Sequence, residues 1–429
     1  MNRILYLLCT FLILATACRQ TGKQPLVQQA DYKSYLGAPK NKTAHIDELM
    51  AFWQKRQAVN PSDLVAQLKI AGLYAKRFGV SGNIRDILVS DSIYNQANQV
   101  QKQFGSSVYR SLATNAITRH RFKEAAAYLD TAFRMGDDKK LTVLQMSDAA
   151  LECGSLANAK KYLEWYPNKN GFEYLSRKAK ISDHEGDLPG AISLMKKAKE
   201  KVQELEDHEL LCWVKTNLAD YYSHNNELKK ALALYREALA TDPEYYHALK
   251  GIAWIAFSND RNTAIAEEIL GYLSRVHPVP DYDLMLAEIA EYRHDEAAKN
   301  RYTRSFIEKA AAPEYGGMYH KYLFSLFADE LDDADKAMAI AATEINNRPT
   351  PEAYSWLSWA YYKKGAIEQA YDIQTRQVEG KCFEPDAAWR MSVICEKKGE
   401  TRKAKKYREE ARSSLFELGP LFETRLKKS

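Results

Sequence analysis

The chain lacks the features of a disordered or nucleic-acid-binding protein. Its 429 residues include 13 prolines and 19 glycines, which are too few for a largely disordered chain. The 61 basic and 56 acidic residues leave a formal net charge of +5. This balance is too even to indicate the concentrated basic face of a nucleic-acid-binding protein. We therefore expect most of the chain to fold and expect no nucleic acid as a partner.

The chain also lacks catalytic and metal-binding motifs. It contains no GxxxxGK[ST], GxGxxG, HExxH or GxSxG sequence and no CxxC or Cys/His metal spacing. The histidines closest in sequence, His208, His224 and His247, fall at polar-face or loop positions, which favours a surface location over metal ligation. We expect no enzyme activity, no cofactor and no metal. A disulfide between Cys382 and Cys395 stays open, with a buried thiol as the simpler interpretation.

What the chain does contain is a repeat of 34 residues. Ala125 and Ala159 are separated by one period, as are Ala370 and Ala404, and each alanine follows a short polar turn. A fixed period of this length predicts a solenoid of stacked helix pairs. Aligning the small and aromatic positions places unit starts near 64, 106, 140, 172, 212, 246, 280, 318, 351 and 385. The internal boundaries of the units at 246 and 280 are the least certain.

One unit carries the repeat pattern at every expected position: Leu218, Ala219, Tyr222, Ala231, Tyr235, Ala238 and Pro243. It resembles the tetratricopeptide (TPR) pattern of small, aromatic and proline positions. The resemblance implies an all-α, right-handed superhelix of about ten TPR helix pairs over residues 64–418. The pattern pairs Ala219 with Ala231 where two helices cross, since a larger side chain would push the helix axes apart.

The turn between the two helices of a unit repeats as well. Equivalent places are occupied by Gly154, Gly186, Asn226, Asp332, Gly365 and Gly399. Glycine adopts the left-handed backbone freely, and asparagine and aspartate tolerate it. We therefore predict a left-handed residue at each of these turns.

The first residues resemble a bacterial lipoprotein signal. Arg3 precedes an apolar run over 4–14, and Ala15, Thr16 and Ala17 lead into Cys18. The resemblance implies a signal peptide at 1–17 and lipid on Cys18, with an ordinary secretory peptide or a retained membrane helix as alternatives. We assign 18–43 to a flexible tether, 44–63 to a capping helix and 419–429 to a C-terminal cap.

The same resemblance has implications for location. It indicates a Gram-negative, Bacteroidetes-like cell envelope. Arg19 is not the aspartate associated with inner-membrane retention, which favours the outer membrane. The side of that membrane, the partner and the oligomeric state stay open.

The TPR resemblance implies that the first helix of each unit faces a concave groove. The large residues at these positions, which we predict to bind a partner, are Trp213, His247, Lys250, Trp254, Phe257, Tyr319, Tyr322, Trp359, Tyr362 and Trp389. Aromatic side chains offer a large contact area at a small entropy cost. The alternative is that a tight superhelix buries them against neighbouring helices.

From these features we expect a non-catalytic scaffold, anchored to the cell envelope, that binds another protein or a peptide in its groove. The second candidate is a nutrient-binding lipoprotein similar to SusD-type glycan receptors. Those proteins carry large non-repeat insertions, of which this chain has almost none. The C-terminal units are rich in lysine and arginine, including Lys403 and Lys406. We interpret this basic stretch as a solvated outer face, or alternatively as a contact for anionic lipid or an acidic partner.

Overall fold

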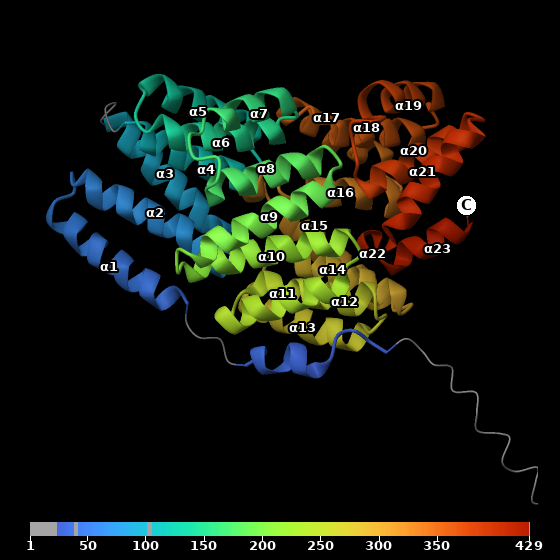
Figure 1. Ribbon diagram of the computed structural model, residues 1–429, viewed down its shortest axis with the longest axis horizontal. Coiled ribbons are helices and arrows are strands. Elements are labelled where there is room, and N and C mark those ends of the chain that lie inside the picture. The colour runs from blue at the N-terminus through green and yellow to red at the C-terminus, as the bar shows by residue number, and fades with distance from the viewer. Residues whose placement is uncertain (1–23, 38–41, 101–104, 429) are drawn as a thin grey trace, which may run out of the picture.

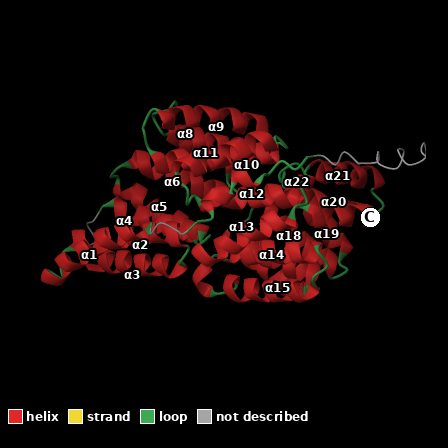
Figure 2. Ribbon diagram, turned by 90° about the horizontal axis from the view of Figure 1, so that it is seen from below, coloured by secondary structure: helices red, strands yellow, loops and turns green. Residues whose placement is uncertain are grey.

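The computed structural model describes residues 24–37, 42–100 and 105–428, and over these residues it contains helices and no strand (Figure 2). Helix α1 (Thr43–Val59) precedes ten antiparallel helix pairs. The first five are α2 (Leu64–Ser81) with α3 (Ile84–Val100), α4 (Ser106–Thr118) with α5 (Phe122–Met135), α6 (Lys139–Glu152) with α7 (Leu156–Glu164), α8 (Phe172–His184) with α9 (Leu188–Gln203), and α10 (His208–His224) with α11 (Leu228–Thr241).

The next pairs are α12 (Tyr246–Ser258) with α13 (Thr263–Val276), α14 (Pro280–Tyr292) with α15 (Glu296–Ala310), α16 (His320–Ser325) with α17 (Ala334–Asn347), α18 (Pro351–Lys363) with α19 (Ile367–Ile373), and α20 (Pro385–Lys397) with α21 (Thr401–Ser413). Two π-helical turns, η4 (Leu326–Glu330) and η5 (Gln374–Val378), extend α16 and α19, and the chain ends in α22 (Leu415–Leu418) and α23 (Pro420–Lys428). This arrangement confirms the predicted all-α helix-pair solenoid.

The predicted unit starts agree closely with the first helices of the pairs. The starts at 246 and 280, which were the least certain, coincide with the first residues of α12 and α14. The largest difference is in the fifth pair, where α10 begins at His208 instead of near 212. Asp207 explains the earlier start, because its carboxylate caps the helix by accepting the backbone N–H of Leu210 at 2.9 Å.

A left-handed residue stands two positions before the second helix of every pair. The ten residues, with φ between +50° and +80°, are Gly82, His120, Gly154, Gly186, Asn226, Arg261, His294, Asp332, Gly365 and Gly399. The six predicted left-handed turns are therefore confirmed. The histidines and the arginine at this position show that the helix-pair geometry imposes the conformation even on residues that pay a steric cost for it.

The superhelix curls until early pairs touch late ones. The Arg119 guanidinium in the α4–α5 turn donates to the carbonyl oxygen of Glu314 at 2.8 Å, and Arg119 accepts the backbone N–H of Gly317 at 3.0 Å. A Cβ on Gly154, in the α6–α7 turn, would lie 3.0 Å from the carbonyl oxygen of Pro349. Figure 1 shows α7 next to α17 as a result of this curl.

The N-terminal segment differs from the tether that we expected. Residues 24–37 include two short 3-10 turns, η1 (Gln29–Asp31) and η2 (Lys33–Tyr35), and lie along α11 and α13 (Figure 1). The Asp260 carboxylate accepts the backbone N–H groups of Leu26 at 2.9 Å and Val27 at 2.8 Å. Val27 and Tyr32 are each only 1% exposed. The flexible tether is therefore wrong for residues 24–37, because the solenoid supplies both an acceptor for the segment's backbone and a surface for its apolar side chains.

Candidate functional site

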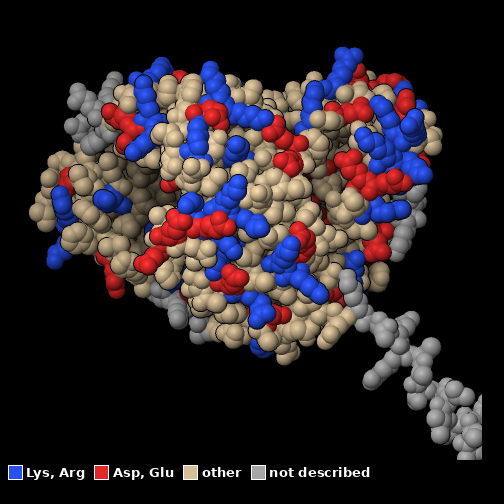
Figure 3. Space-filling model, viewed as in Figure 1, with Lys and Arg blue, Asp and Glu red and all other residues tan. Residues whose placement is uncertain are grey.

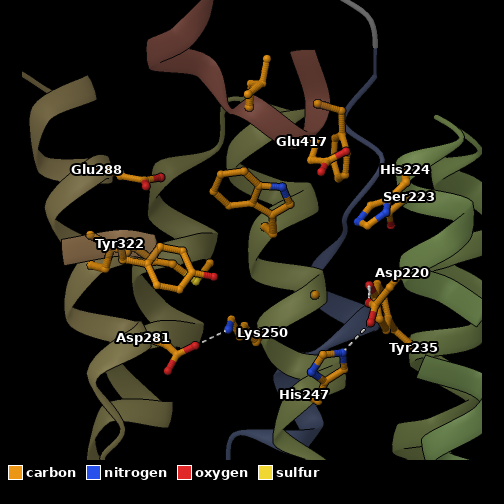
Figure 4. Close-up of a pocket in the computed structure, with 16 residues that line it drawn as sticks. Asp220, Ser223, His224, Tyr235, His247, Lys250, Asp281, Glu288, Tyr322 and Glu417 are labelled. Atoms are coloured by element: carbon orange, nitrogen blue, oxygen red, sulfur yellow. Dashed lines mark hydrogen bonds and ion pairs between the residues drawn. The ribbon is translucent and has the colours of Figure 1, made fainter. Parts of the chain in front are cut away.

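A cavity of about 330 Å³ lies inside the superhelix. The first helices of four consecutive pairs, α10, α12, α14 and α16, provide most of its wall, together with Tyr235 from α11, and α22 contributes Phe416, Glu417 and Leu418. Figure 4 shows the side chains on these helices pointing toward a common space. First helices therefore face inward here, as the repeat pattern indicated.

Two ion pairs at the base of the cavity are satisfied internally. Lys250 lies 2.7 Å from Asp281, whose carboxylate also accepts the Tyr319 hydroxyl at 2.7 Å. His247 Nε2 lies 2.9 Å from Asp220, which accepts the Tyr235 hydroxyl at 2.5 Å. Burial alone would raise the pKa of both aspartates, but their partners hold each pKa below its usual value. Both aspartates are thus ionised and already occupied at neutral pH.

Two other carboxyl groups in the wall have no such partner. The side chains of Glu288 on α14 and Glu417 on α22 make no hydrogen bond or ion pair with the described residues. Burial, reinforced by the charge of Glu330, raises the pKa of Glu288 to about 7. Burial also raises the pKa of Glu417, with Glu384 adding to the effect and His224 opposing it. The cavity wall therefore contains more carboxyl groups than basic side chains.

The C-terminal segment closes the cavity above Trp254. Gly419 lies against the indole so closely that a Cβ would be 3.0 Å from Trp254 Cη2. The Ser258 hydroxyl donates to the carbonyl oxygen of Phe416 at 2.5 Å, and Arg261 lies 3.0 Å from Glu423. Since both contacts fasten the segment to α12 and its following turn, α22 is held in place as one side of the cavity wall.

Of the ten residues predicted to bind a partner, the structure brings five together. His247, Lys250, Trp254 and Tyr322 line the cavity, and Tyr319 reaches it through its hydrogen bond to Asp281. The side chain of Tyr322 is 41% exposed. These five residues come from α12 and α16 and the residue before α16.

The other five lie elsewhere and are mostly packed. Phe257 is 0% exposed, so it forms core and not a binding surface. Trp359 is 7% exposed, donates its indole N–H to Asp329 at 2.8 Å and stacks on Tyr362 with ring centroids 4.7 Å apart. Trp389 packs edge-on against Phe422 of α23. Burial against neighbouring elements, the alternative interpretation, therefore describes these side chains.

Trp213 remains on the surface. It is 39% exposed and contacts the ring of Phe172 with centroids 5.6 Å apart, outside the cavity wall. It therefore provides a comparison for Trp254, which comes from the equivalent helix of the next pair.

Three acidic residues of the site were missed by the sequence analysis. Asp281 and Glu288 occupy the second and ninth positions of the unit that starts at 280, on the first helix that the repeat pattern turns toward the groove. They were not selected because we chose mainly large aromatic residues at such positions. Glu417 lies beyond the repeats, so no repeat position identifies it.

A second charged network lies deeper in the superhelix and joins distant pairs. Arg348, at the end of α17, binds Glu344 and lies 3.6 Å from Glu152 of α6 and 3.7 Å from Glu352 of α18. His320 Nδ1 lies 2.6 Å from the other oxygen of Glu344. Glu344 itself is 0% exposed.

The described residues contain no group of three or more His, Cys, Asp or Glu side chains arranged to hold a metal ion. Cys382 and Cys395, whose pairing was open, are both free thiols, as are Cys153 and Cys212. No helix among the described residues has the length and apolar character needed to cross a membrane.

Comparison with known proteins agrees with the helix-pair geometry. Residues 174–244 match the tetratricopeptide repeat. The match covers α8 to α11, the stretch that contains the clearest repeat unit. No curated protein matches the chain.

Three solved TPR-like structures resemble the chain at low identity. A human IFIT1 dimer with PPP-AAAA is 15% identical, with 78% of this chain and 77% of that chain covered and a TM-score of 0.48. YrrB, described as a TPR protein with an unusual peptide-binding site, is 18% identical over 46% of this chain and 95% of that chain, with a TM-score of 0.28. A tetratricopeptide repeat protein from Parabacteroides merdae is 17% identical over 62% and 99%, with a TM-score of 0.37.

Proposed function

We propose that the protein is a non-catalytic TPR scaffold that binds a segment of another protein in the cavity inside its superhelix. The observation that carries this proposal is the convergence of His247, Lys250, Trp254 and Tyr322 on one cavity of about 330 Å³. A concave space with aromatic walls and a few polar groups is typical of a binding site. The volume is suited to one or two inserted side chains, with the rest of the segment outside.

The alternatives have less support. Between α2 and α21 the described helix pairs follow one another without an inserted domain, which is unlike the glycan receptors considered above. Lys, Arg, Asp and Glu side chains are interspersed over the face seen in Figure 3. The unpaired cavity carboxyl groups also repel phosphates. We therefore propose no nucleic-acid partner, although one of the similar structures is an IFIT1 dimer with PPP-AAAA.

Replacing Trp254 tests the cavity as the binding site. Once a partner has been captured by crosslinking, we expect Trp254→Ala to weaken binding at least tenfold, because a buried aromatic anchor typically contributes about 2 kcal/mol or more. Trp213→Ala is the matched control, since that tryptophan lies outside the cavity. Lys403→Ala with Lys406→Ala tests the basic C-terminal face. Strong effects from either control with none from Trp254→Ala would move the site to the outer surface.

We further propose that lipid on Cys18 anchors the scaffold to the outer membrane. Pro25, where the docked segment begins to follow the solenoid, is seven positions after Cys18, and seven residue steps span at most about 25 Å. The anchor would therefore hold the body close to the bilayer, with the α11 and α13 side nearest. This is a much shorter reach than a tether extending to residue 43 would allow.

The anchoring is tested by Cys18→Ala. We expect this change to abolish labelling by a fatty-acid probe and to release the protein from the membrane fraction, because lipid chains supply the hydrophobic attachment. Cys153→Ala is the control and should label like the wild type. Labelling that survives Cys18→Ala would place the lipid elsewhere.

A further inference from the structure

The charge balance of the cavity is the starting point. Asp220 with His247, and Lys250 with Asp281, form pairs whose members satisfy each other. Glu288, Glu417 and His224 are left over, and His224 offsets part of the negative charge of Glu417. Figure 4 shows Glu288 and Tyr322 from one side and Glu417 from above directed toward the same space. The unmatched charge in the cavity is therefore negative.

Buried carboxyl groups next to the cavity behave like Glu417. Burial is the main cause that raises the pKa of Asp183 and Glu352; His224 opposes the shift at Asp183, and Lys321, which pairs with Glu352 at 3.0 Å, opposes it at Glu352. A raised carboxyl pKa means that ionisation is disfavoured by desolvation and by surrounding negative charge. An entering cation relieves both, whereas an entering anion adds to the repulsion. Lys250 offers no free positive charge because it is already paired with Asp281, whose carboxylate also accepts the Tyr319 hydroxyl.

The aromatic wall has matching chemistry. Trp254 and Tyr322 line the same cavity as Glu288. The negative faces of such rings attract ammonium and guanidinium groups, and the attraction grows when the cation is desolvated. Leu284 and Met285 provide apolar contact for an aliphatic stem. A carboxylate, two rings and an apolar wall together match a long side chain with a positive end.

We propose that the cavity selects a cationic group, a lysine or arginine side chain presented by the bound protein segment, which Glu288 receives between Trp254 and Tyr322. The assignment of the cation to a protein rests on the proposed function. A free polyamine has the same chemistry and is the other source. The recognition itself needs only the cavity and its carboxylates.

The proposal has a pH signature. The charged groups that face Glu288 are Glu330 of η4, Glu291 of α14 and Arg425 of α23, and Lys299 of α15 pairs with both of those glutamates. Since a cation binds the ionised carboxylate, affinity must follow the ionised fraction of Glu288. With a pKa of about 7, that fraction rises about tenfold between pH 6 and pH 8.

The test uses the purified full-length chain and capped tripeptides Ala-X-Ala, where X is lysine, arginine, norleucine or glutamate, with spermidine as the free amine. Calorimetric titration should show binding of the lysine and arginine peptides, at least tenfold weaker binding of the norleucine and glutamate peptides, and about tenfold tighter lysine binding at pH 8 than at pH 6. Glu288→Gln should weaken lysine binding at least tenfold. Glu308→Gln, at an exposed carboxylate of α15, should not.

Equal binding of the norleucine and lysine peptides, or unchanged lysine binding in Glu288→Gln, would overturn the proposal. Thermal melting checks that the Glu288→Gln variant is folded, and Glu288→Asp, which keeps the charge, should retain part of the affinity. Spermidine binding without peptide binding would keep the cation site but contradict the protein-binding function. A captured protein whose binding needs Trp254 but not Glu288 would keep that function and overturn the cation site.

Discussion

Arg348→Ala is expected to lower the free energy of unfolding by about 3–5 kcal/mol, the usual cost of removing one partner from a buried charge network. The Arg348 guanidinium binds Glu344 and lies within 4 Å of Glu152 and Glu352. Burial would raise the pKa of Glu344, but His320 and Arg348 together lower it. Without the guanidinium, fully buried Glu344 would keep its charge with His320 as its remaining close partner.

The loss should also loosen the closure of the superhelix, because Glu152 belongs to the third helix pair and Arg348 follows the second helix of the eighth. Urea unfolding measures the effect. The control is Arg376→Ala, which removes an exposed pair with Asp372 and should cost less than about 1 kcal/mol. A similarly small loss for Arg348→Ala would mean that water already solvates the network.

The sequence predicted the repeat unit well because the unit is a local structure. The left-handed residues at Gly154 and Asn226 and the burial of Ala219 and Ala231 in one core cluster depend on neighbours less than one repeat away. The curl of the superhelix depends instead on small rotations between successive pairs, which accumulate over the array. The total rotation cannot be deduced from the pattern of residues within one repeat. The approach of Gly154 to Pro349 was therefore not predictable.

The N-terminal segment escaped prediction for a related reason. Val27 and Tyr32 are its buried apolar side chains, and two apolar residues are too few to show a periodicity. Its attachment depends on Asp260, which lies far away in the sequence and binds backbone N–H groups that every residue possesses. Only the folded solenoid brings that acceptor to the segment.

Half of the residues that were selected from the sequence line or reach the cavity. The inward positions of α12 selected His247, Lys250 and Trp254, which lie in its wall. The same rule gave Phe257 and Trp359, which are buried: Phe257 packs against Tyr292 of α14, and Trp359 donates its indole N–H to Asp329 of η4. A rule based on position predicts direction but does not distinguish a side chain that reaches a cavity from one that meets the next helix.

Glu288→Gln is expected to stabilise the protein increasingly as the pH rises. The pKa of Glu288 is about 7 in the folded protein and 4.5 in the unfolded chain. The folded state therefore binds the proton more tightly, and this carboxyl group lowers stability progressively as the pH rises from about 4.5 to about 7. The variant should gain about 2 kcal/mol over the wild type between pH 5.5 and pH 8, since each pKa unit is worth about 1.36 kcal/mol.

The comparison must be between variant and wild type, because other groups titrate in the same range with the opposite sign. Burial lowers the pKa of His120 and His277 to about 4, so their contribution to the free energy of unfolding is present above the unfolded value of 6.5 and is lost as the pH falls from about 6.5 to about 4. Both histidines are present in each protein and cancel in the difference. Glu308→Gln, which removes an exposed carboxylate outside the cavity, is measured alongside as the control for the loss of one charge. If the Glu288→Gln difference were flat, water would have to reach Glu288 freely, and the cavity would lose the desolvated charge on which its selection of a cation depends.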